Sequence, residues 1–109
     1  MNKMFIKKAD IYKYVNCDDF YFFTRSSNKT YAITKKGSFV IGASLNYLNE
    51  IMGSDFLRTH KSYLVNISKI DSISKYTDRT YNIKFIGIRD QAYITNENMK
   101  ILLSKGAVL

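Results

Sequence analysis

Residues 56–67 read Phe-Leu-Arg-Thr-His-Lys-Ser-Tyr-Leu-Val-Asn-Ile, a polar half followed by an apolar half. The polar half places Arg58, His60, Lys61 and Ser62 within five positions. Fixed cations, a titratable ring and a hydroxyl in such proximity can bind phosphate oxygens or the edges of bases. The apolar half is rich in β-branched and aromatic residues, which indicates a buried strand that holds the polar half in place. On chemistry alone, this pattern favours anion or nucleic-acid binding no more than a solvated charged surface.

The order Phe-x-Arg-x-His-Lys-Ser-Tyr-x-Val-Asn in residues 56–66 resembles the signature of the LytTR family. This family is the DNA-binding output domain of AlgR/AgrA/LytR-type transcription regulators, and its pattern runs close to Phe-x-Arg-x-His-Arg-Ser-x-x-Val-Asn. Lys61 stands where family members vary between Arg, Asn, Lys and other hydrogen-bonding residues. The likeness extends in length and order over residues 18–103. It implies an elongated β-β-β sandwich with a short mid-chain helix and a short C-terminal helix.

Composition and residue patterning also predict a mostly β protein. The 109 residues have room for one domain, 1–109, and nine Tyr without any Pro favour strands. The continuously apolar stretch Phe20–Phe23 predicts a central strand. The other expected strands are 4–8, 11–17, 30–34, 39–41, 63–67, 70–76, 80–86 and 91–95. Two helices are expected, the first at 44–53 with Ser44 as N-cap and Gly53 as the stop, the second at 96–103.

LytTR domains reach DNA from loops, so the resemblance makes three segments candidate DNA contacts. The candidates are Asn28, Lys29 and Thr30, then Arg58, His60, Lys61 and Ser62, and finally Thr95, Asn96, Glu97 and Asn98. Family members commonly carry Ser-Arg at the last of these places. This chain departs from that pattern: Glu97 would repel phosphate, although its carboxylate could accept a hydrogen bond from a cytosine amino group. For His60 and Asn66 a structural alternative is a side chain that pins neighbouring backbone, and for Asn66 this is the preferred interpretation.

The remaining features narrow the class of protein. A net charge of +8 and a pI near 9.6 indicate a polyanionic partner. A single Cys and a single His exclude a disulfide framework and a His/Cys metal cluster, and no Gly-rich phosphate loop is present. Asp55, His60 and Ser62 supply the letters of a triad without a nucleophile elbow. We therefore expect no enzyme, no catalytic residue, no metal and no cofactor. No apolar run is long enough for a membrane span, so we expect no membrane and a cytoplasmic location.

These observations predict sequence-specific binding of double-stranded DNA by the output domain of a bacterial-type response regulator in a two-component system. The resemblance implies that loops enter successive major grooves and that a homodimer forms on paired DNA sites. It also implies a receiver domain outside this chain, unless the regulator stands alone. The alternative is a small basic β-rich interaction module that binds a protein or an acidic polymer non-specifically.

Overall fold

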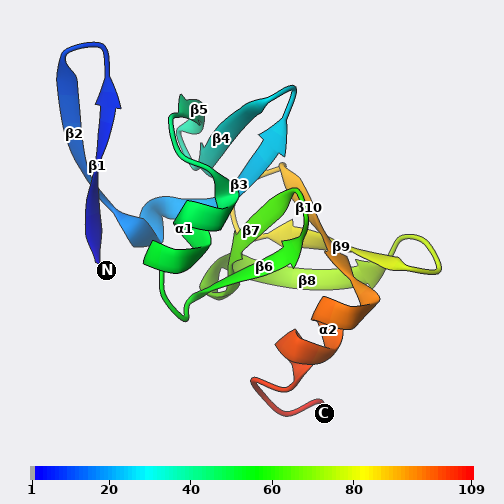
Figure 1. Cartoon of the computed structure of the whole chain (residues 1–109). Coiled ribbons are helices and arrows are strands. Elements are labelled where there is room, and N and C mark those ends of the chain that lie inside the picture. The colour runs from blue at the N-terminus through cyan, green and yellow to red at the C-terminus, as the bar shows by residue number, and fades with distance from the viewer. Residues whose placement is uncertain (1) are drawn as a thin grey trace.

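The computed structural model describes residues 2–109, and strands dominate it (Figure 1). Short 3₁₀ turns cover Cys17–Asp19 and Ile67–Lys69. The strands and helices follow the order β1 (Lys3–Lys8), β2 (Ile11–Asn16), β3 (Phe20–Ser26), β4 (Lys29–Thr34), β5 (Gly37–Ile41), α1 (Leu45–Ile51), β6 (Phe56–His60), β7 (Tyr63–Asn66), β8 (Ile70–Lys75), β9 (Thr80–Phe85), β10 (Gln91–Thr95) and α2 (Asn96–Leu103).

A five-stranded antiparallel sheet in the order β5-β4-β3-β7-β6 forms the centre of the molecule. Its middle strand, β3, begins with the apolar run Phe20–Phe23, as the sequence predicts for a central strand. The register shifts between Phe20 and Phe22, so the run serves two cores. Phe20 and Phe23 pack on one face, whereas Tyr21 and Phe22 pack on the other. A sheet buried on both faces explains why this strand lacks a polar alternation.

Helix α1 covers one face of this sheet. Ser44 caps the helix, because its Oγ accepts a hydrogen bond of 3.0 Å from the backbone N–H of Tyr47. Leu45 and Leu48 point into the core on the Phe20 and Phe23 face of the sheet, the first core. Full burial of each leucine contributes about 2 kcal/mol. Gly53, with φ of +80°, follows the helix in a conformation that favours glycine. The predicted helix and its cap are therefore confirmed.

The opposite face of the sheet packs against a second, three-stranded sheet in the order β10-β9-β8. Ile83 and Ile94 are fully buried in this second core, and Phe85 stacks on Phe22 with ring centroids 5.2 Å apart. Met99 and Leu102 of α2 close the core at one side. Each sheet alone would expose an apolar face, and their packing removes both faces from water.

Residues 56–66 form a hairpin of two strands. This corrects the prediction of a polar segment followed by a single strand. Arg58 and His60 of the polar half belong to strand β6, whereas Lys61 and Ser62 form the turn to β7. Asn66 bridges strands as predicted. Its amide donates to the carbonyl of Phe20 at 2.9 Å, and its Oδ1 accepts from the backbone N–H of Ser68. The amide is fully buried, so these bonds remove the cost of burying it.

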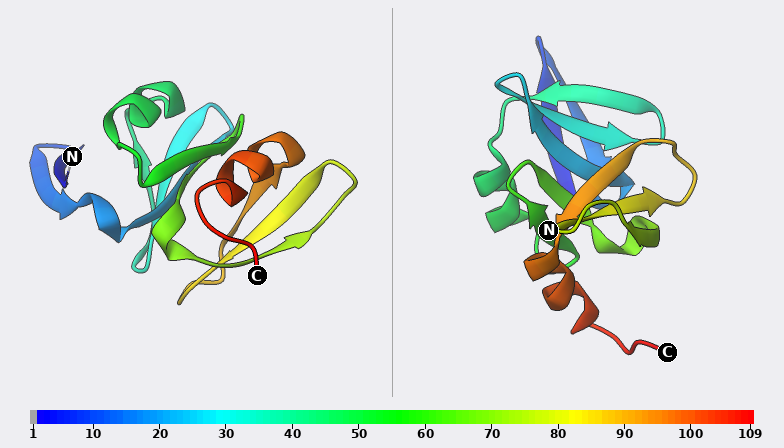
Figure 2. Two further views of the ribbon diagram at one scale, coloured as in Figure 1. Left: turned by 90° about the horizontal axis from the view of Figure 1, so that it is seen from below. Right: turned by 90° about the vertical axis from the view of Figure 1, so that its right-hand side faces the viewer.

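Strands β1 and β2 form a separate two-stranded sheet that extends from one end of the molecule (Figures 1 and 2). The overall extents are 47 × 28 × 26 Å. The protein is thus mostly β, elongated and equipped with two short helices, as predicted. Within residues 2–109, no helix has the length and apolarity needed to cross a membrane.

Candidate nucleic-acid interface

Arg58 organises the β6–β7 turn from within. Its Nε donates to the carbonyl of His60 at 3.1 Å, and its Nη2 donates to the carbonyl of Lys61 at 2.6 Å. Its Nη1 donates to Oδ1 of Asn46 in α1 at 2.9 Å. Burial lowers the pKa of Arg58 below its usual value. A DNA contact by Arg58, which the resemblance implies, stays a prediction, but this guanidinium already has three partners in the protein.

His60 fixes the other side of the same turn. Its Nδ1 accepts a hydrogen bond of 3.0 Å from the backbone N–H of Ser62. A neutral ring that accepts at Nδ1 carries its proton on Nε2, which leaves Nε2 as a donor. Burial, then the cations of Lys61 and Arg58, lower the pKa of His60 below its usual value. The ring is therefore held neutral, as a backbone clamp with one remaining donor.

A bulge at Thr59 connects this hairpin to the second sheet and to α2. The register shifts between Arg58 and His60, and Thr59 is fully buried between them. Its Oγ1 donates to the carbonyl of Tyr93 in β10 at 2.7 Å. Its carbonyl accepts from Nδ2 of Asn98 in α2 at 2.9 Å. The bulge thus places the start of α2 beside the β6–β7 turn.

The β3–β4 turn lies on the other side of the β6–β7 turn. Ser27 and Asn28 form this turn with φ of +51° and +62°, the backbone of a tight two-residue hairpin. The backbone N–H of Arg25 donates to the carbonyl of Ser62 at 3.0 Å, which joins the two turns. Asn28 and Lys29 are exposed. Thr30 is 1% exposed and accepts a hydrogen bond from Nη1 of Arg25, so its side chain faces inward rather than toward a ligand.

The first turn of α2 mainly supports its neighbours. Thr95 caps the helix by accepting from the backbone N–H of Asn98. Asn96 holds the β8–β9 turn, because its side chain donates to the carbonyl of Asp78 and its backbone N–H donates to that of Arg79. Glu97 is exposed. Of the four residues that the sequence singled out here, three make structural hydrogen bonds and one side chain points to solvent.

The three predicted segments come together along one side of the molecule. The β3–β4 turn, the β6–β7 turn and the start of α2 follow one another in both views of Figure 2, and the β8–β9 turn comes next. We call these four segments the turn row. Its exposed cations are Arg25, Lys29, Lys61 and Arg79. The sequence did not identify Arg25 and Arg79 as site residues. Their position beside Ser62 and Asn96 depends on backbone hydrogen bonds that no local pattern reveals.

A series of contacting aromatic rings adjoins the turn row. Tyr76 packs on Tyr93 with ring centroids 5.1 Å apart, Tyr93 packs on Tyr63 at 5.7 Å, and Tyr63 packs on His60 at 5.6 Å. The second and third of these contacts are edge-to-face, an arrangement that aromatic pairs favour. Within residues 2–109, no group of His, Cys, Asp or Glu side chains could hold a metal ion.

A mostly β scaffold that presents exposed cations on adjacent turns is suited to binding the phosphates of a nucleic acid. The chain belongs to the LytTr DNA-binding domain family, which it matches over residues 10–106. It is 38% identical over 56 residues to the transcriptional regulatory protein NatR of Bacillus subtilis. That match covers 48% of this chain and 24% of NatR, so the chain spans only a part of this relative.

The fold is also similar to a solved structure. This is the LytTr DNA-binding domain of a Bacillus cereus protein described as a methyl-accepting/DNA response regulator. The TM-score is 0.80, and the match covers 95% of each chain at 18% sequence identity. At that identity the likeness concerns the fold. The resemblance recognised in residues 56–66 is confirmed by the family match.

Proposed function

We propose that residues 1–109 act as one domain that recognises double-stranded DNA sequence-specifically through the turn row. The observation that carries this proposal is the joining of three distant segments by Arg25 N–H to Ser62 and by Asn98 to Thr59. Exposed Arg and Lys side chains that lie close together on turns contribute little stability to the fold in water. They gain much from a polyanion, because each phosphate contact releases counterions from the duplex.

Contacts to phosphate would position the domain, whereas contacts to base edges would confer specificity. We assign Arg25, Lys29 and Arg79 to phosphates, because they are exposed cations on the turn row. Lys61 is exposed at the tip of the β6–β7 turn, where Arg58 bonds to its backbone carbonyl, and we assign its side chain to guanine O6 and N7.

His60, Ser62 and Asn28 complete the proposed base-reading surface. Nε2 of His60 is free to donate to a base acceptor, since Nδ1 is already bonded to Ser62. Glu97 is exposed next to them, where its carboxylate would accept from a cytosine amino group. Arg58, Thr30, Thr95, Asn96 and Asn98 instead hold the turns in shape, as their internal hydrogen bonds support.

The mode of docking follows from the shape of the interface. Three of the four contact segments are turns between strands, and the fourth, the start of α2, carries Glu97 and Asn98 rather than a basic face. A major groove about 12 Å wide admits a hairpin turn. The elongated molecule would lie along the duplex, and its turns would enter successive grooves.

We further propose a setting for this domain. NatR carries the name of a transcriptional regulatory protein and the Bacillus cereus relative that of a response regulator. By analogy, this chain would be the output part of a cytoplasmic transcription regulator. It would bind paired DNA sites as a homodimer and work with a receiver domain outside this chain.

Selection of bound duplexes from a random pool tests the proposal, followed by salt titration on the selected duplex and a scrambled one. We expect an enriched sequence and an affinity for it that exceeds the scrambled duplex at every salt concentration. If both duplexes bind equally and lose affinity with salt in parallel, the row reads only charge. The protein would then be the basic interaction module that the sequence left as the alternative.

A further inference from the structure

Both outer edges of the two-stranded N-terminal sheet lack a strand partner within residues 2–109, and the edge of β1 is one of them. Strand β1 pairs with β2 over Lys3–Lys8, and within residues 2–109 it pairs with no other strand. The carbonyl of Asn2 accepts from the backbone N–H of Cys17, so Asn2 faces β2. Residues that face the partner alternate along an antiparallel strand. The backbone groups of Lys3, Phe5 and Lys7 therefore point away from β2.

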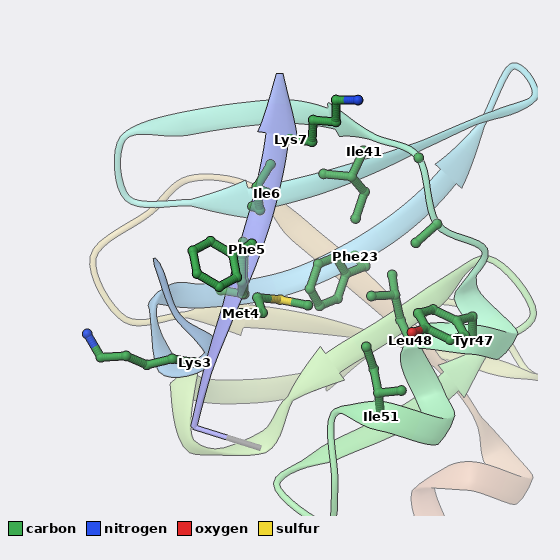
Figure 3. Close-up of a pocket in the computed structure, with 13 residues that line it drawn as sticks. Lys3, Met4, Phe5, Ile6, Lys7, Phe23, Ile41, Tyr47, Leu48 and Ile51 are labelled. Atoms are coloured by element: carbon green, nitrogen blue, oxygen red, sulfur yellow. The ribbon is translucent and has the colours of Figure 1, made fainter. Parts of the chain in front are cut away.

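A hollow of about 650 Å³ lies along this free edge (Figure 3). Five consecutive residues of β1, Lys3–Lys7, line it, as expected when a strand borders a cavity with its backbone. The opposite wall is apolar and comes from α1 and the end of β5, with Ile41, Tyr47, Leu48 and Ile51. Unpaired backbone beside an apolar wall is the arrangement that accepts an added β-strand.

The two faces of β1 specify what such a strand would carry. Met4 and Ile6 are half-buried and pack against the first core, so their face is apolar. Lys3, Phe5 and Lys7 occupy the exposed outer face. The lining contains two lysines and no carboxylate. Residues directly opposite one another share a face, so a pair of acidic residues four positions apart would meet Lys3 and Lys7.

A second copy of β1 does not satisfy this requirement. Antiparallel pairing of two β1 edges about Phe5 would bring Lys3 opposite Lys7 twice, and like charges in direct opposition are destabilising. The hairpin as a whole carries Lys3, Lys7, Lys8 and Lys13 against Asp10. Its charge therefore favours an acidic partner over itself.

We propose that the free edge of β1 binds an extended, acidic segment of another protein by strand addition. The segment would have acidic residues at positions i and i+4, and apolar residues at the three positions between. Two further observations support this site. An isolated two-stranded hairpin is marginally stable in water and gains from a third strand. In addition, β1 lies outside residues 10–106, which match the family, and at the end of the molecule remote from α2 (Figure 2).

The test is a titration of the isotope-labelled full chain with the peptide Ser-Glu-Val-Tyr-Val-Glu-Ser, followed by amide chemical shifts. Binding should shift the amides of Lys3, Phe5 and Lys7. N-methylation of alternate peptide bonds on the edge that meets β1 should abolish binding, because it removes the donors of the new ladder. The same peptide with both Glu replaced by Lys should bind about tenfold more weakly.

Charge reversal in the protein provides the matched control. The double variant Lys3→Glu, Lys7→Glu should bind the Glu peptide about tenfold more weakly than the original protein does. It should bind the Lys peptide about tenfold more tightly. Reversal of two exposed lysines elsewhere, Lys84→Glu with Lys105→Glu, should leave the affinities for both peptides unchanged. Shifts of the β2 amides report whether the variant hairpin is folded. Rescue by the Lys peptide separates lost charge from lost structure.

Four results would overturn the proposal. One is absence of binding, and another is equal binding of the Glu and Lys peptides. A third is shifts centred on Lys29 and Lys61, which would make the peptide a mimic of DNA on the turn row. The fourth is self-association of the free chain through β1, since a second copy would then be the occupant.

Discussion

Substitution of Arg58 separates a turn-organising role from a phosphate contact. Arg58→Lys keeps the charge but loses the planar fork that reaches His60, Lys61 and Asn46 at once. Arg58→Ala loses both. If the guanidinium acts through the shape of the β6–β7 turn, the two variants should behave alike.

The expected magnitude follows from these hydrogen bonds. Two of these three bonds are exposed and contribute about 0.5 kcal/mol each, whereas the part-buried bond to His60 contributes about 1 kcal/mol. The sum is about 2 kcal/mol. For a domain of this size that lowers the melting temperature by roughly 10 °C. A misplaced Lys61 should weaken specific DNA binding by about tenfold in both variants.

Thermal unfolding and DNA titration over a range of salt concentrations measure these effects. We expect equal losses of melting temperature for Arg58→Lys and Arg58→Ala, and a salt slope close to that of the original protein. The reasoning is refuted if Arg58→Lys retains full stability and affinity while Arg58→Ala lowers the salt slope by about one unit. That outcome would restore Arg58 as a phosphate contact.

Three further predictions concern neighbouring residues. Lys29→Ala should weaken DNA binding and leave the melting temperature nearly unchanged, whereas Thr30→Ala should destabilise the buried hairpin by about 1 kcal/mol, as denaturant titration would show. Asn66→Ala should cost about 2–4 kcal/mol in the same assay, because its amide is fully buried and bonded. The depressed pKa of His60 means that the folded state resists its protonation, so stability should fall as pH drops below about 6.5. A His60→Gln variant should lack this pH dependence, and its persistence there would contradict the assignment.

Local patterns were sufficient to predict the helices and most strands. Ser44, the spacing of Leu45 and Leu48, and Gly53 define α1 without reference to the rest of the chain. The run Phe20–Phe23 revealed a strand buried on both faces, although the register shift that divides it between two cores was not visible in the sequence.

The sequence predicted which segments form the candidate site, but not how these segments are arranged in space. The signature identified residues 56–66, but it did not show that Arg58 and His60 face the turn they precede. The resemblance makes Thr30 a candidate contact as part of a loop, whereas the residue lies in β4 with its side chain turned inward. Arg25 and Arg79 join the row through long-range backbone bonds. The bulge at Thr59 depends on two distant partners, the carbonyl of Tyr93 and the side chain of Asn98, which sequence periodicity does not reveal.

Paired titrations of the original protein and Lys61→Ala on the selected and scrambled duplexes, at one salt concentration, test the central claim most directly. The claim is that the β6–β7 turn reads sequence. Lys61→Ala should lower affinity for the selected duplex by roughly ten- to a hundredfold, since a good contact to guanine discriminates by about 1–3 kcal/mol. Its affinity for the scrambled duplex should fall much less. Equal losses on the two duplexes would make Lys61 a phosphate contact and contradict the claim.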